Sequence, residues 1–252
     1  MREKLIEQRK KKIKRWFYIF LTVAIFGSIL FARFFIPSYF KNLSVFSLKN
    51  IAIEPADYSS FIKDYISLPE KISIFSIDMA EIYSKIKKIY FVEDCVIEKH
   101  LPDALIIRLK IRTPWVVVAD EKSAAMMDRN GYFLPLVEDF KGWVVEGIKP
   151  ESAGNRSEEQ EKLAVLKEIE QWYNYYGIAN LFKIETVSIF DFDRIELTSE
   201  DKSIYIRGTE IDKQLAMAKD VLSGCKKNNL PFEYIDVRFK DPYVKEKESQ
   251  KQ

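Results

Sequence analysis

The sequence predicts an α+β protein in which an N-terminal transmembrane helix precedes two folded domains. Residues 16–32 carry no charge and are numerous enough to form such a helix. Between residues 46 and 112, the hydrophobic spacing predicts the order strand, helix, helix, strand, strand. From residue 114 onward, short alternating stretches predict a mixed β-domain, interrupted by two stretches with helical spacing.

The net charge of the chain conceals an asymmetric distribution. The whole sequence has a formal net charge of +2, with 31% charged and 47% hydrophobic residues, an ordinary globular balance. Residues 1–15 hold eight Lys or Arg against two Glu, a net charge of +6, so the remaining 237 residues sum to −4. We therefore expect no nucleic acid among the partners of the folded domains.

The uncharged run WFYIFLTVAIFGSILFA, residues 16–32, is predicted to form the membrane helix. As a helix it spans ~25 Å, and residues 34–36 extend the apolar run to about 30 Å, the thickness of a bilayer core. Arg33 lies near one end, where its side chain can snorkel to the headgroups. Residues 1–15 are then a cytoplasmic basic tail, residues 16–36 a single-pass signal anchor, and the rest of the chain lies outside the cytoplasm.

Two other interpretations of this run are less consistent with the sequence. A cleaved signal peptide has a shorter apolar region, of roughly 7–15 residues, followed by small residues at the cleavage site. Here the run is longer and ends in FARFFIPSYF, which offers a poor cleavage site. A buried helix of a soluble protein is disfavoured by the adjacent basic cluster.

We expect the first domain at residues 44–113. Its predicted elements are a strand at 46–54, a helix at 57–68, an alternating stretch at 72–77, a helix at 79–89, and strands at 91–99 and 104–112. The first helix is expected to bury one face, made of Phe61, Tyr65 and Leu68. Asp78 is expected to cap the second helix, and residues 101–103 to form the turn between the last two strands.

Cys95, His100 and Asp103 are the residue types of a thiol hydrolase, and His100 is the only histidine of the chain. The strand pattern argues against that interpretation. Cys95 shares a face with Ile97 and belongs to the core, whereas His100 lies an odd number of residues away, beside the turn. A nucleophile needs its base within hydrogen-bonding reach, and this arrangement does not provide it.

The second domain is expected at residues 114–243, with a disordered tail at 244–252. Thr113-Pro114 marks its beginning, and the Asp-Arg-Asn-Gly turn at 128–131 predicts a hairpin. A helix is expected at 157–177, with Ser157 and Gln160 as a capping box and Gly177 at its end. A strand meander at 185–208, a helix at 210–225 and a last strand at 231–239 follow.

The sequence contains no motif of an enzyme site. It lacks a glycine-rich phosphate loop, a CxxC pair and an HExxH motif, so we predict no catalytic, cofactor-binding or metal-binding residues and no cofactor. The two cysteines, Cys95 and Cys225, are 130 positions apart and are expected to remain unpaired thiols. An anchored, non-enzymatic binding module is the favoured class.

Four segments resemble the FtsQ/DivIB family of bacterial cell-division proteins, in the family's order and behind a basic tail and a single anchor. They are IFSIDMAEIYSKI, the region from Tyr90 to Pro114, AAMMDRNGYFL and YIDVRF. In the second of these, Cys95 occupies a small-residue position, Lys99 stands where the family has Arg, and Leu101-Pro102-Asp103 matches the turn. The resemblance implies that the first domain is a polypeptide-transport-associated (POTRA) domain with the order β-α-α-β-β.

The resemblance also implies a function, a location and partners. It implies a scaffold of the division machinery, at the septum of the cytoplasmic membrane, that binds FtsB/DivIC-like and FtsL-like proteins and meets other division proteins through its POTRA domain. Family members bind FtsB by strand addition at the last strand of the β-domain, here residues 234–244. The expected partner contacts are Tyr234, Arg238, Phe239 and Tyr243.

Three alternatives remain open at this point. Tyr234 and Phe239 are also typical of residues that pack the β-domain itself. A chain with a POTRA domain can also be a chaperone or translocation subunit of the cell envelope, guiding extended clients along a sheet edge. The thiol hydrolase is the third alternative and the least favoured.

Overall fold

The computed structural model describes residues 16–33, 43–69, 71–137 and 139–247. It has the predicted α+β architecture, with an N-terminal apolar helix and two mixed sheets. The helix Trp16–Arg33 has a mean hydropathy of 1.8 and no buried residue, so by length and composition it can cross a membrane. The predicted tail 1–15 and the anchor positions 34–36 lie outside the described residues. The folded part divides into two compact units, the first formed by residues up to Lys87 and Asp94–Lys110, the second by Lys88–Glu93 and residues from Ile111 onward.

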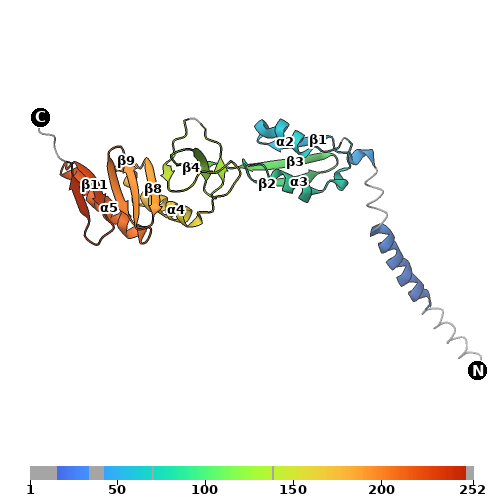
Figure 1. The fold of residues 1–252 in the computed structure, drawn as a ribbon. Coiled ribbons are helices and arrows are strands. Elements are labelled where there is room, and N and C mark those ends of the chain that lie inside the picture. The colour runs from blue at the N-terminus through green and yellow to red at the C-terminus, as the bar shows by residue number, and fades with distance from the viewer. Residues whose placement is uncertain (1–15, 34–42, 70, 138, 248–252) are drawn as a thin grey trace, which may run out of the picture. The chain divides into compact units, whose positions relative to one another are not determined.

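The first sheet contains three strands among the described residues, and two helices accompany it (Figure 1). In chain order the elements are β1 Asn50–Glu54, α2 Ser59–Ile66, α3 Met79–Ile86, β2 Val92–His100 and β3 Ala104–Ile111. This is the predicted order of strand, helix, helix, strand, strand. The strands lie in the order β1-β3-β2, with β1 parallel to β3, and the turn at residues 101–103 joins β2 to β3.

The core of the first unit is aliphatic. Its buried members include, from both helices and β3, Ile62, Ile66, Ile82, Ile86, Leu105 and Ile107. Asp78 caps α3 as predicted, because its carboxylate accepts hydrogen bonds from the backbone N–H groups of Ala80 and Glu81. The alternating stretch 72–77 contains a turn of 3-10 helix, Ile74–Ser76.

The buried face of α2 differs from the prediction. Phe61 and Tyr65 are exposed and stack on each other, with ring centroids 6.0 Å apart, whereas Ile62 and Ile66 face the core. Both pairs have helical spacing, and the branched aliphatic pair is the one that fits between the helix and the sheet. The helix also ends earlier than predicted, because Ser67 adopts a left-handed conformation.

The second unit is built on a nine-stranded mixed sheet, counted over the described residues. Its strands are β4 Pro114–Ala119, β5 Ala124–Asp128, β6 Phe133–Leu134, β7 Val144–Glu146, β8 Thr186–Asp191, β9 Arg194–Ser199, β10 Lys202–Ile206, β11 Phe232–Asp236 and β12 Tyr243–Glu246. They lie in the order β12-β11-β10-β9-β8-β7-β4-β5-β6. The pairs β4–β7, β7–β8 and β10–β11 are parallel, and the others are antiparallel.

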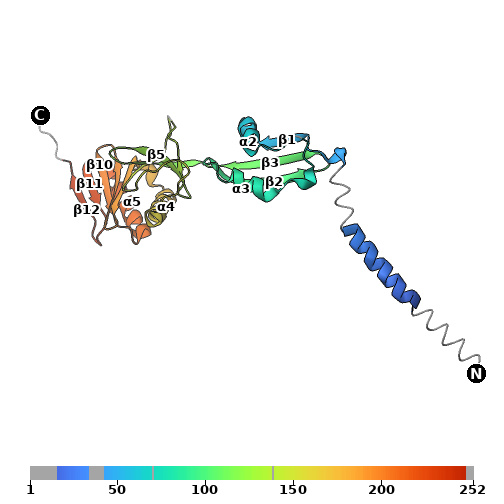
Figure 2. The ribbon, with the colours of Figure 1, turned by 45° about the vertical axis from the view of Figure 1, so that its right-hand side comes forward.

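Two helices, α4 Gln160–Tyr175 and α5 Ile211–Lys227, cover one face of this sheet (Figure 2). The predicted stripe of α5 is confirmed, since Ile211, Leu215, Ala218 and Leu222 are all buried. The capping box predicted for α4 is wrong. The Ser157 hydroxyl accepts from the N–H of Glu159, while the Gln160 side chain donates to the Ser157 carbonyl, so the helix begins only at Gln160.

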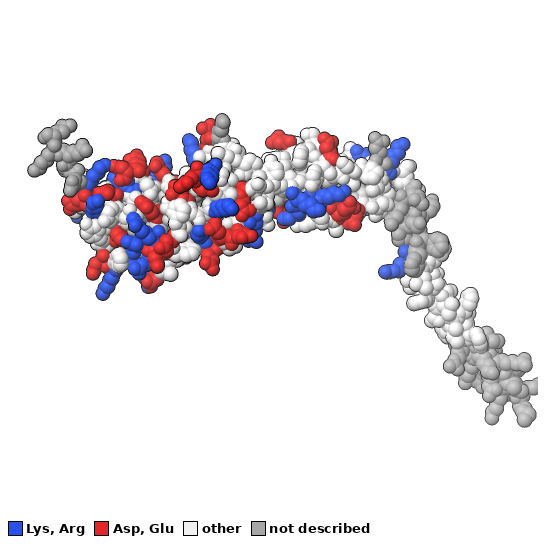
Figure 3. All heavy atoms as spheres, in the orientation of Figure 1, with Lys and Arg blue, Asp and Glu red and all other residues white. Residues whose placement is uncertain are grey.

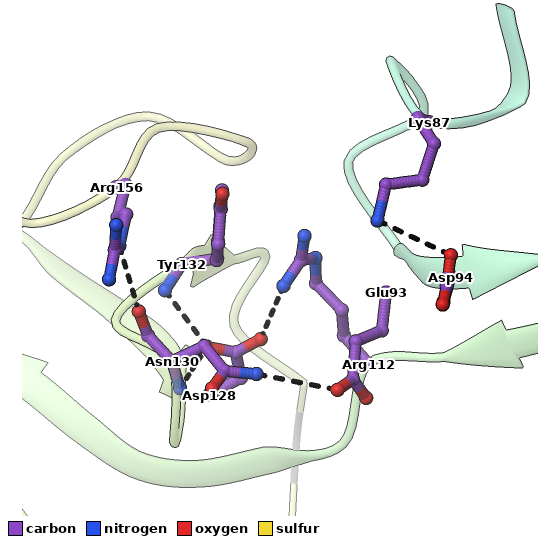
Figure 4. A network of polar contacts seen from close by, with 8 residues as sticks. All are labelled: Lys87, Glu93, Asp94, Arg112, Asp128, Asn130, Tyr132 and Arg156. Atoms are coloured by element: carbon purple, nitrogen blue, oxygen red, sulfur yellow. Dashed lines mark hydrogen bonds and ion pairs between the residues drawn. The ribbon is translucent and has the colours of Figure 1, made fainter. Parts of the chain in front are cut away.

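An ion pair is buried where the second unit begins. Arg112 Nη1 lies 2.7 Å from Asp128 Oδ2, with side chains only 7% and 5% exposed (Figure 4). The second Asp128 oxygen accepts from the N–H groups of Asn130 and Tyr132, and the Arg112 guanidinium lies 3.7 Å from the Tyr132 ring centroid. Asp128 therefore orders the predicted hairpin turn and also neutralises a buried cation.

Candidate functional site

The two edges of the nine-stranded sheet differ in how they are covered. At one edge, the two-residue strand β6 is paired on its outer side, because Phe133 donates to the carbonyl of Asn155 and accepts from the N–H of Gly154, both at 2.9 Å. At the other edge, β12 is the last strand, and none of the described residues pairs with its outer side. An unpaired edge strand is a template for another chain.

The register of β12 identifies which backbone groups point outward. The N–H of Lys247 donates to the carbonyl of Pro231 beside β11, at 3.1 Å. Backbone groups alternate in direction along an antiparallel strand, so the N–H and C=O of Glu246 and Val244 point away from β11. These groups form a short row that an incoming strand can pair with.

Tyrosine side chains cover the outer face of the sheet next to this edge. On β10, Tyr205 lies between the buried Ile204 and Ile206 and therefore points away from the helices. Its ring centroid lies 5.2 Å from that of Tyr234 on β11, which lies 5.9 Å from that of Tyr243 on β12. The three rings form a row that ends at the open edge.

The loop between β11 and β12 adds an arginine and a phenylalanine. Asp236, the last residue of β11, accepts two hydrogen bonds from the Arg238 guanidinium, at 2.9 and 2.7 Å. These two hydrogen bonds hold the Arg238 side chain against the loop and leave it only 21% exposed. Phe239 is 53% exposed, and its ring centroid lies 5.2 Å from the guanidinium carbon of Arg207 and 5.4 Å from that of Arg238.

The Asp236–Arg238 pair makes the stability of this part of the fold depend on pH. Burial raises the pKa of Asp236, but the hydrogen bonds and charge of Arg238 outweigh it, so the pKa lies below the ordinary value of about 3.9. A carboxyl group whose pKa is lower in the folded than in the unfolded protein stabilises the fold at pH values above its unfolded-state pKa. This stabilisation is lost as the pH falls through the folded-state pKa.

We expect Arg238→Leu to lower the free energy of unfolding of the second unit by roughly 1–3 kcal/mol near neutral pH, because a charge-assisted pair is lost. The difference from the unchanged chain should shrink below about pH 4, as Asp236 becomes protonated. Urea unfolding at a series of pH values measures this, with Lys240→Leu in the same loop as the matched control. A difference that stays constant across the pH series would contradict the assigned pairing.

The structure brings three of the four predicted contact residues close to the open edge. Tyr234 and Tyr243 are neighbours, and Phe239 is exposed in the adjoining loop. The fourth, Arg238, is largely engaged by Asp236.

The last strand predicted at 231–239 is β11, which ends at Asp236, and the predicted binding segment 234–244 spans parts of two strands joined by a loop, with Pro242 immediately before β12. Residues 244–246, predicted to belong to a disordered tail, are part of β12. The β11 strand is consequently an inner strand of the sheet. Proline at the end of the loop provided a signal for this break, because Pro is tolerated at the start of a strand and disfavoured within it.

Sequence reasoning missed two residues of this surface, Tyr205 and Arg207. The alternation in Ser203–Gly208 provided a signal for Tyr205, since a tyrosine between two isoleucines of one strand faces away from the core. No pattern indicated that Arg207 contacts Phe239, because they lie on different elements.

The thiol-hydrolase arrangement is not formed in the first unit. Cys95 is only 6% exposed, and burial, followed by the charge of Asp94, raises the pKa of its thiol to about 11. His100 is exposed at the end of β2, with Nε2 3.5 Å from Glu98 Oε2. A buried thiol with a raised pKa is protonated near neutral pH and is a poor nucleophile. Over the described ranges, no cluster of three His, Cys, Asp or Glu residues is arranged to hold a metal ion.

Charges on the second unit are interspersed on the face that Figure 3 shows. Acidic and basic side chains alternate over it, without a large area of one sign. Such a distribution does not favour this face for binding a long polyanion.

Comparison with known proteins relates most of the chain to a cell division protein. No family model matches the sequence. The chain is 27% identical, over an alignment of 237 residues, to a cell division protein DivIB of Clostridium tetani. The alignment covers 84% of this chain and 83% of that protein, so it extends well beyond any single motif.

Proposed function

Because the chain belongs to the FtsQ/DivIB family of bacterial cell-division proteins, we propose that it is a membrane-anchored, non-catalytic scaffold of the division machinery. It links early and late division proteins during septum formation, with its N-terminus in the cytoplasm and its two units outside. The observation that carries this proposal is the alignment over most of both chains. The apolar helix Trp16–Arg33 supports the single-pass anchor.

We propose that residues 44–113 form a POTRA domain and residues 114–243, extended by the rest of β12, form the β-domain. The order β1-α2-α3-β2-β3 and the parallel β1–β3 pair support the first assignment. In this proposal the POTRA domain meets other division proteins, and the β-domain receives FtsB/DivIC-like and FtsL-like proteins.

The open β12 edge supports strand addition as the mode of binding. An extended partner segment pairs with the outward backbone groups of Val244 and Glu246, which gives affinity independent of its sequence. Specificity comes from side chains on the outer face, where Tyr234 and Tyr243 offer large apolar surfaces and Phe239 adds an exposed ring. Arg238 contributes by holding the loop that presents Phe239.

Depletion of the protein from growing cells tests the proposal. We expect filaments with unfinished septa, and restoration of septation by the full chain supplied from a second copy of its gene. A chain with Cys95→Ala should restore septation equally well, because the buried thiol has no chemical role. Normal septation after depletion would overturn the proposal, and loss of outer-envelope proteins without filaments would favour the chaperone or translocation subunit.

A further inference from the structure

We propose that the end of the first unit nearest the anchor in sequence docks on the lipid bilayer that holds the anchor. The docking surface consists of Val45, Phe46, Phe75 and Leu101, here called the membrane-facing end. The inference rests on the anchor of the proposed function, and it is independent of any division partner.

Hydrogen bonds bring the three segments of this surface together. The segment from Ser47 to Asn50 lies between the segments that contain Ile72 and Asp103. The Leu48 N–H donates to the Ile72 carbonyl at 2.8 Å, and the Lys49 N–H donates to the Asp103 carbonyl at 2.9 Å. Ser47 and Ser73 form an isolated β-bridge, and Asn50 is paired with Ala104. Residues 44–47, 73–76 and the turn at 101–103 therefore share one end of the unit, as both ribbon views show (Figures 1 and 2).

Large apolar side chains are exposed at this end. Val45 is 58% exposed, Phe75 39% and Leu101 60%. The rings of Phe46 and Phe75 contact each other edge to face, with centroids 5.0 Å apart, which fixes the 3-10 turn of residues 44–46 against the one at residues 74–76. Lys49 and Lys71 are exposed beside them, and Lys49 lies 3.2 Å from Asp103. Apolar tips with flanking lysines are typical of surfaces that enter the headgroup region.

The covalent connection to the anchor favours the bilayer as the occupant. Ten residues separate Arg33 from Ser44. They limit the distance between these two residues to roughly 40 Å, even if the connection is fully extended. The membrane-facing end therefore stays within roughly 40 Å of the end of the anchor. Because the two are covalently linked, even a weak apolar contact with the bilayer can hold this end in place.

Fluorescence quenching in reconstituted vesicles tests the proposal. The full chain carrying Leu101→Cys or, as a matched control, Val96→Cys is labelled with an environment-sensitive NBD group. The native cysteines are buried, and Val96 is 54% exposed on β2, about 16 Å along the chain before Leu101 in the following turn. Vesicles of phosphatidylcholine with a minor fraction of phosphatidylglycerol contain doxyl-labelled lipid as the quencher.

We expect quenching at position 101 to exceed that at position 96 by roughly twofold or more, since docked apolar tips reach about 5–10 Å into the interface. Val45→Asp should reduce the quenching at position 101 to the control value. Equal quenching at both positions, or no effect of Val45→Asp, would overturn the docking. Failure of the anchor is detected separately, because a chain without an inserted helix is released from the vesicles by alkaline carbonate.

Discussion

A chain carrying Glu246→Pro is expected to bind an FtsB/DivIC-type partner tenfold to a hundredfold more weakly. Proline removes the outward N–H of Glu246, so a buried carbonyl of the added strand loses its donor at a cost of about 1–3 kcal/mol. The fold itself should be preserved, because that N–H makes no bond within the sheet and proline is tolerated on edge strands. Calorimetric titration of the full chain in detergent with the partner's extracytoplasmic segment measures the effect.

Two matched variants separate backbone pairing from side-chain contact at this edge. Glu246→Ala keeps the N–H and should bind almost as well as the unchanged chain. Phe239→Asp keeps all backbone groups of β12 but removes an exposed ring. It should therefore weaken partner binding only through the loss of side-chain contacts. If Glu246→Pro and Glu246→Ala bind equally, the partner does not pair with β12.

Replacement of Arg112 by alanine is expected to destabilise the second unit by about 3–5 kcal/mol, because it leaves the carboxylate of Asp128 buried without its cation. The same carboxylate orders the β5–β6 turn through Asn130 and Tyr132, so the loss should extend to the hairpin. Urea unfolding followed by tryptophan fluorescence reports on this unit, since Trp115, Trp143 and Trp172 all lie in it.

Lys213→Ala is the control for this prediction. Its ion pair with Glu210 is solvent-exposed on both sides, at 68% and 66%, and exposed pairs contribute little. An Arg112→Ala chain that unfolds at the same urea concentration as the Lys213→Ala chain would show that the buried pair does not stabilise the unit.

The sequence predicted the elements of both units well where one hydrophobic pattern dominates. Strict alternation identified β3, and the Asp-Arg-Asn-Gly turn identified the hairpin that the structure forms with Gly131 at a positive φ of 84°. The cap of α3 was also predictable, because Asp78 is followed at once by helical spacing. In each case a local interaction determines the structure.

The predictions are wrong where the local sequence is compatible with two structures and contacts between distant residues select one of them. In α2, Phe61 and Tyr65 have the same spacing as Ile62 and Ile66, and only packing against the sheet selects the isoleucines. At the C-terminal end, the strand predicted at 231–239 ends already at Asp236, because the Asp236–Arg238 pair holds a loop that leads to the separate strand β12. The position of β12 at an open edge depends on the order of all nine strands, which no local pattern specifies.

The parallel pairing of β10 with β11 has a consequence for the time at which the partner can bind. The chain must complete α5 before β11 can join β10, and β12 follows only after another loop. Domains fold from the N-terminus during synthesis, at roughly 5–20 residues per second, so β12 is the last of the described strands to be made. An unfinished chain exposes β10 as its edge and lacks both Tyr234 and Tyr243. If the partner binds by the proposed strand addition at β12, completed molecules recruit it and nascent ones do not.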